Sequence, residues 1–210
     1  VTVTGTTVRV PTGAVLDAAP PCVAAGILVG GFGAPAATLA NNSINVGPKD
    51  GCPALGISVV DLATNATPGH ASLITNNQVT VFNTVPPEGS VPASSNAGVR
   101  VVAGTAAGAA AMTITNNTVQ VHNALTLQLH FPLADVAAPW VPVVTHNNFE
   151  QTLSDVGGLP QDVPQFQATR GAESLATPTA FEASSAGSGN YWGNYLGWDR
   201  NGDGRGDVPY

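Results

Sequence analysis

The chain of 210 residues is long enough to bury a hydrophobic core in one domain. Only 9% of its residues are charged, its formal net charge is −7, and its six Lys and Arg residues form no basic cluster, which argues against nucleic acid as a partner. With 24 Gly, 17 Pro and no apolar run long enough to cross a bilayer, the composition predicts a mainly β protein without a membrane span.

A repeat of nine residues recurs along the chain. Apolar residues alternate within each copy, as at Val79 and Val81, which indicates strands with one buried face. A two-residue step interrupts each copy, and its first residue is of a type that tolerates left-handed backbone geometry. We expect the second asparagines to stack and to hydrogen-bond from repeat to repeat. The copies are residues 2–10, 38–46, 73–81, 113–121 and 143–151, the bend residues are Gly5, Asn41, Asn76, Asn116 and Asn147, and the stacked asparagines are Asn42, Asn77, Asn117 and Asn148.

A second apolar strand follows each of the first four copies, beginning at Gly26, Gly56, Gly98 and, less regularly, Ala124. Two strands per repeat with loops of unequal length predict a solenoid of about four to five coils, in which each coil buries its inner face against its neighbours. A β-sandwich of unrelated strands is the alternative, because alternation alone is common to both.

The two cysteines occupy equivalent positions, since Cys22 and Cys52 each lie four residues before the glycine of the second strand. Equivalent positions in adjacent coils are about 4.8 Å apart, a separation that a disulfide accepts. We expect a bridge between them, with two buried thiols as the alternative. A disulfide implies an extracellular or cell-surface location. Glycosylation at the sequons Asn41, Asn65 and Asn116 would fit that location.

The chain ends in an Asp- and Gly-rich loop that predicts a calcium site. Side-chain oxygens of Asp199, Asn201, Asp203 and Asp207 and the backbone carbonyl of Arg205 are the expected Ca²⁺ ligands. An EF-hand is excluded because Tyr210 stands where that loop needs glutamate, and a turn without metal is the alternative. The tripeptide from Arg205 to Asp207 also spells an integrin attachment motif, but Asp207 is better explained as a calcium ligand.

The repeat, followed by NYWGNY and then DRNGDGRGDVPY, resembles the right-handed parallel β-helix repeat proteins of archaeal and bacterial surfaces. This broad family includes a periplasmic copper-processing protein of nitrous oxide reduction. The resemblance implies β-helix coils over residues 1–151 and an aromatic and calcium-loop cap over 190–210. An irregular excursion, residues 152–189, separates them. Copper handling is not carried over, because His70, His122, His130 and His146 include no close ligand pair.

The predicted function depends on the absence of recognisable catalytic motifs and on the strand with which the sequence opens. Asp17, Asp50 and Asp61 fall in adjacent coils, but no motif of a polysaccharide lyase, glycoside hydrolase or serine hydrolase surrounds them. The chain opens directly on a strand, so we expect an uncapped first coil that docks head to tail on another copy. The leading hypothesis is a secreted structural protein that forms a filament or surface layer, with itself and cell-surface glycans as partners. A carbohydrate-binding or carbohydrate-cleaving β-helix, or one module of a longer surface protein, are the alternatives.

Overall fold

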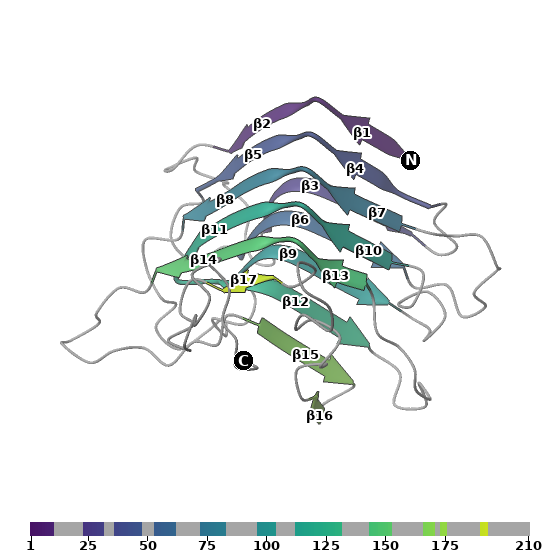
Figure 1. Cartoon of the computed structure of the whole chain (residues 1–210), viewed down its shortest axis with the longest axis vertical. Coiled ribbons are helices and arrows are strands. Elements are labelled where there is room, and N and C mark those ends of the chain that lie inside the picture. The colour runs from purple at the N-terminus through teal and green to yellow at the C-terminus, as the bar shows by residue number, and fades with distance from the viewer. Residues whose placement is uncertain are drawn as a thin grey trace, which may run out of the picture.

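The computed structural model describes residues 1–10, 23–31, 36–47, 53–61, 72–82, 96–103, 112–131, 143–152, 166–170, 173–175 and 190–192. All regular secondary structure in these ranges is β, in three sheets of stacked strands (Figure 1). No helix among these residues is long and apolar enough to cross a membrane.

The three sheets run through the same repeats, so that each repeat contributes one strand to each sheet. Sheet A contains β1 (Thr2–Thr4), β4 (Thr38–Ala40), β7 (Ser72–Thr75), β10 (Met112–Thr115) and β13 (Val143–Thr145). Sheet B contains β2 (Thr7–Val10), β5 (Ser43–Val46), β8 (Gln78–Phe82), β11 (Thr118–His122), β14 (Asn148–Thr152) and β17 (Tyr191–Trp192). Sheet C contains β3 (Ala24–Gly31), β6 (Ala54–Asp61), β9 (Ala97–Ala103), β12 (Leu125–Phe131), β15 (Phe166–Arg170) and β16 (Glu173–Leu175).

The strand register follows the nine-residue alignment. Thr2, Thr38, Leu73, Thr113 and Val143 are successive partners in sheet A, and the same gapless alignment holds through sheet B. Every strand pair is parallel except β15 with β16. The parallel, stacked arrangement is therefore confirmed. The bend splits each copy into two strands, so a repeat has three strands where two were expected.

The fifth bend was assigned one residue too late. His146 has the left-handed φ of 57°, and Asn147 takes the stacked position that was predicted for Asn148. Asn148 is instead the first residue of β14. The run His-Asn-Asn permits either assignment, but only this one points Val144 and Phe149 inward, where both are fully buried.

The fourth copy of the second strand was also misaligned. Leu125 pairs with Ala97 and Leu127 with Val99, so Thr126 and not Ala124 lies opposite Gly98. Two strands also lie within residues 152–189, which were expected to be irregular. One of them, β15, extends sheet C beside β12.

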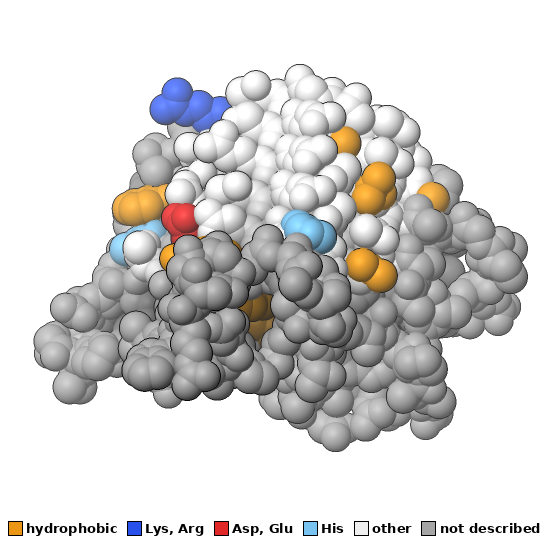
Figure 2. Space-filling model, in the orientation of Figure 1, with side chains coloured by type: hydrophobic (Ala, Val, Ile, Leu, Met, Phe, Trp, Pro, Cys, Tyr) orange, Lys and Arg blue, Asp and Glu red, His pale blue; other side chains and the backbone are white. Residues whose placement is uncertain are grey.

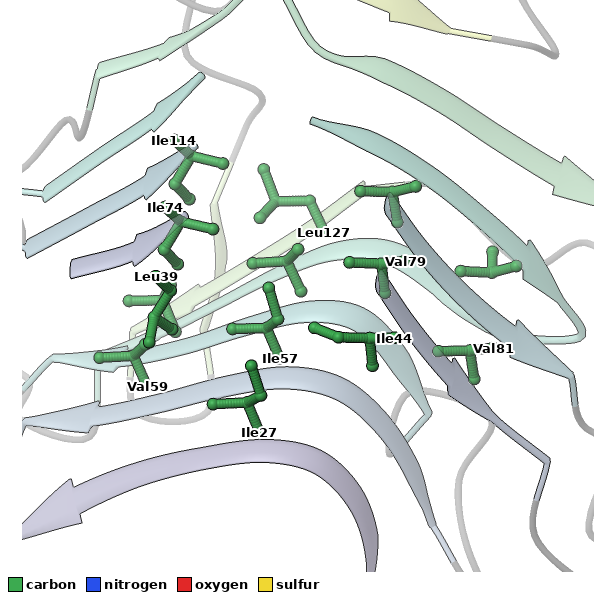
Figure 3. Close-up of a cluster of buried hydrophobic side chains, with 14 of the residues drawn as sticks. Ile27, Leu39, Ile44, Ile57, Val59, Ile74, Val79, Val81, Ile114 and Leu127 are labelled. Atoms are coloured by element: carbon green, nitrogen blue, oxygen red, sulfur yellow. The ribbon is translucent and has the colours of Figure 1, made fainter. Parts of the chain in front are cut away.

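The core lies between the three sheets and consists of columns of branched apolar side chains. Figure 3 shows one column from sheet C, Ile27, Ile57 and Leu127, facing Leu39, Ile74 and Ile114 of sheet A and Ile44 and Val79 of sheet B. Each of these residues is at most 7% exposed, and burial of one such side chain is worth about 1.5–3 kcal/mol. Because equivalent residues stack in register, each repeat extends the columns of the last.

The core closes differently at its two ends. Trp192 on β17 is 5% exposed and stacks on Phe149 with ring centroids 4.6 Å apart, while Phe166 meets its edge. Tyr195 and Trp198, which belong to the same predicted cap, lie outside the described residues, so the cap as a whole stays a prediction. At the opposite end, the apolar side chains of β1 and β2 are only partly buried.

Candidate functional site

A ladder of buried asparagines holds the bend between sheets A and B. Each side-chain amide donates from Nδ2 to Oδ1 of the next asparagine at 2.8–2.9 Å, and each backbone N–H donates to the same oxygen at 3.0–3.1 Å. Nδ2 also donates to a carbonyl of the preceding repeat, such as Leu39 O or Ile74 O. The ladder runs through Asn42, Asn77, Asn117 and Asn147, all at most 2% exposed, and continues to Asn190. Asn190 was not predicted as a member of the ladder, because it follows the preceding repeat only after a long gap.

A ridge of exposed residues runs beside the ladder at the left-handed bend positions. Asn41, Asn76, Asn116 and His146 have φ values of 53–57°, and Gly5 has 62°. Two of the three predicted glycosylation sites, Asn41 and Asn116, are exposed on this ridge, while Asn65 lies outside the described residues. Attachment of a glycan there stays a prediction.

The first repeat presents a sheet edge with core-type side chains. Val3, Val8 and Val10 are partly buried, whereas their in-register equivalents Leu39, Ile44 and Val46 are at most 2% exposed. β1, β2 and β3 are each the outermost strand of a sheet. Among the described residues, no strand pairs with their outer edges. Residues of this edge that point inward carry no charge, and inward charges are a common protection against edge pairing.

The outward face of sheet B carries a cluster of hydrogen-bonded polar and aromatic side chains. Phe82, which is 42% exposed, stacks on His122 with ring centroids 4.8 Å apart, and His122 Nδ1 lies 2.8 Å from Thr152 Oγ1. In the next column, Glu150 accepts one hydrogen bond from Gln120 Nε2 at 2.9 Å and another from Asn148 Nδ2 at 2.8 Å. The described surface seen in Figure 2 is otherwise mostly uncharged and polar. None of these residues was predicted as a site. They come from three different strands, and only the pairing of those strands brings them together.

The predicted metal and disulfide residues lie outside the described part of the chain. This holds for Asp199, Asn201, Asp203, Arg205 and Asp207 and for Cys22 and Cys52. The strands that follow the cysteines do pair as the alignment expected, with Ala24 opposite Ala54. In the described ranges, no group of three His, Cys, Asp or Glu residues is placed to hold a metal.

The acidic residues considered for catalysis are not brought together in the described ranges. Asp17 and Asp50 lie outside them, and Asp61 ends β6, where its backbone pairs with Gly31 and Ala103. Glu150 is the one carboxylate whose side chain the structure describes. The described geometry thus contains no pair of carboxylates for glycoside hydrolysis.

Comparison with known proteins finds a short similarity. A segment of 29 residues, 14% of this chain, is 66% identical to the probable ABC transporter binding protein NosD of Stutzerimonas stutzeri, and the same figures hold for NosD of Pseudomonas aeruginosa. The match spans 7% of the length of each relative. No family model and no solved structure matches the chain. The predicted resemblance is therefore supported over a small part of the chain.

Proposed function

We propose that this protein is a right-handed parallel β-helix of four to five coils that assembles head to tail into an extracellular filament or surface layer. The observation that carries the proposal is the edge formed by β1, β2 and β3, with its partly exposed valines. Unpaired strand edges above an apolar core bind another strand readily. We propose that a second copy of the chain supplies it.

The opposite end of sheet A suits this contact. β13 is the outermost strand there, and Val143 on it is 49% exposed. β1 reads Thr-Val-Thr, close to the Thr-Ile-Thr that already pairs with β13 within the chain. In sheet B the outermost strand at this end is β17, which already covers β14, so a copy docked here would add its β2 beyond β17. Such contacts do not close on themselves and generate fibres.

The remaining predicted features would stabilise a protein outside the cell. We propose that Cys22 and Cys52 form a disulfide and that the loop from Asp199 to Asp207 binds Ca²⁺ as a clamp on the C-terminal cap. The equivalent register of Ala24 and Ala54 supports the first of these, since each residue follows its cysteine by two positions. Glycans at Asn41 and Asn116 would extend from an exposed ridge and leave the strand edges uncovered.

Replacing Val8 with lysine should abolish self-assembly. The substitution places a charge on the inward side of the outermost strand, where docking would bury it without a partner. Thr7→Lys is the matched control, because Thr7 is the neighbouring residue on β2 and is exposed. In size-exclusion chromatography with light scattering, we expect V8K to be monomeric and T7K to assemble like the unaltered protein. Assembly by V8K, or a closed dimer of the unaltered protein, would exclude this contact.

Carbohydrate binding is the second candidate function, and the Phe82 and His122 stack favours it. An exposed aromatic face beside fixed amide and carboxylate groups offers a sugar ring both an apolar surface and hydrogen bonds. With one described carboxylate, Glu150, binding rather than cleavage is the activity that this face supports.

Truncation of Phe82 to alanine tests that candidate. We expect F82A to weaken binding on an oligosaccharide array by about threefold to tenfold, the worth of one aromatic contact. V23A removes an apolar side chain of similar exposure that lies outside sheet B, and it should leave the oligosaccharide signal unchanged. Equal binding by F82A and the unaltered protein, or no binding to any oligosaccharide, would exclude this face as a sugar site.

A further inference from the structure

One column of outward side chains on sheet B carries opposite charges at its two ends. The column begins at Arg9 on β2 and ends at Glu150 on β14, and each member is the direct register partner of the next. Its three inner members are uncharged, namely Asn45, Thr80 and Gln120. Arg9 and Glu150 are the only charged side chains on the described strands of sheet B. This sheet therefore has a positive first edge and a negative far end.

Both charges are available for a further contact. Arg9 is exposed, and it makes no hydrogen bond or ion pair with another described residue. The carboxylate of Glu150 accepts hydrogen bonds from Gln120 Nε2 at 2.9 Å and from Asn148 Nδ2 at 2.8 Å. Both donors are neutral amides, so they orient the carboxylate without neutralising its charge.

Head-to-tail stacking would bring these two charges to the same junction. A second copy docked beyond β17 continues the repeat alignment, so its Val8 lies opposite Trp192, in the column of inward side chains. Arg9 of that copy then falls in the column of Glu150, two strand spacings away, or about 10 Å between Cα atoms. The long side chains of arginine and glutamate together can cross this distance.

We infer that Arg9 of one copy attracts Glu150 of the next and thereby determines the direction of assembly. The inference rests on the proposed head-to-tail contact and adds what selects it over other contacts. Two copies joined by their first edges would bring two Arg9 side chains together, and two joined by their far ends would bring two Glu150 side chains together. Opposite charges meet only when the copies point the same way.

The same attraction selects the register of the contact. A shift of one residue along the strand would turn Arg9 to the inward face of sheet B, away from Glu150. Because both side chains lie near the surface, the attraction is modest and weakens as the salt concentration rises.

Two charge reversals test this pairing, each alone and in a mixture. R9E makes both ends of the column negative, and E150R makes both ends positive. In pelleting assays at low salt with millimolar Ca²⁺, we expect each variant alone to raise the critical concentration for assembly by about threefold to tenfold, because an attraction becomes a repulsion. An equimolar mixture should assemble at close to the concentration of the unaltered protein, since every junction between the two variants joins opposite charges.

The composition of the pellet shows whether the variants alternate. When R9E is mixed with twice as much E150R, we expect mass spectrometry to find equal amounts of the two in the pellet. Recovery of assembly in the mixture also excludes misfolding of either variant as the cause of its own failure. R9Q removes the attraction without adding a repulsion, so its critical concentration should rise by about twofold and depend less on NaCl than that of the unaltered protein.

The outcomes separate this inference from the assembly on which it rests. If the unaltered protein assembles and both reversals assemble equally well, the charge pairing is wrong and the head-to-tail contact stands. A mixture that assembles no better than its components would also overturn the pairing. Failure of the unaltered protein to assemble would exclude both the contact and the pairing.

Discussion

Replacing Asn117 with alanine should lower the free energy of unfolding by about 3 kcal/mol or more, because at least two buried groups each lose about 1–3 kcal/mol of hydrogen bonding. Oδ1 of Asn117 accepts from the backbone N–H and from Nδ2 of Asn77, both within 3.0 Å. Its Nδ2 donates to Ile74 O, Thr115 O and Asn147 Oδ1. Alanine removes all of these hydrogen bonds from a site that is buried from bulk solvent, since Asn117 is 1% exposed.

The neighbouring residue provides the control for this prediction. Asn116 is exposed and has a φ of 56°, so N116G keeps the bend and removes no buried hydrogen bond. We expect N116G to change stability by well under 1 kcal/mol, and urea denaturation followed by circular dichroism measures both variants. A loss in N117A no larger than that in N116G would mean that the ladder does not hold the repeats together.

The second large effect is expected at Gly56, where sheet C approaches sheet B of the next repeat. A Cβ atom at this position would collide with Val79 Cγ1 and would lie 2.5 Å from the carbonyl oxygen of Gly98. The carbonyl belongs to a paired strand and cannot move freely. We therefore expect G56A to destabilise the protein by about 3 kcal/mol, at the upper end of the cost of overpacking a core.

Gly30 on the adjacent strand β3 provides the matched control for G56A. A Cβ atom there would lie 3.4 Å from Val60 Cβ, an ordinary contact, and Gly30 is exposed. G30A should melt within a few degrees of the unaltered protein, and G56A should melt much lower. Similar melting temperatures for the two variants would show that the sheets are not as closely packed as described.

The sequence predicted the stacking of repeats well because the register depends on local features. Alternating valines and the Asn steps identify which residues face inward, and a gapless alignment then specifies every partner from Thr2 to Val143. The prediction failed where two residues of the same type adjoin, at Asn147 and Asn148. It also failed at Thr126, where a side chain replaces the glycine that would have marked the position.

The burial of Ser58 on β6, beside Arg100 on β9, could not be predicted, since alternation identifies the inward face but not whether the outward face of sheet C is also buried. One signal was present. Ser58 and Arg100 occupy the same place after Gly56 and Gly98, and a correct alignment puts them side by side. The stack of Phe82 on His122 was not predicted for a similar reason. Each residue is the last of its own strand, and the two become neighbours only when β8 pairs with β11.

Self-assembly through the edge of the first repeat is the central claim, and electron microscopy of negatively stained protein tests it most directly. The purified protein would be imaged with millimolar Ca²⁺ and again after addition of a chelator, with V8K imaged in parallel. We expect filaments or sheets of the unaltered protein in Ca²⁺, loss of order on chelation, and isolated particles for V8K. Compact single particles of the unaltered protein under both conditions would contradict the claim and leave sugar binding as the function to pursue.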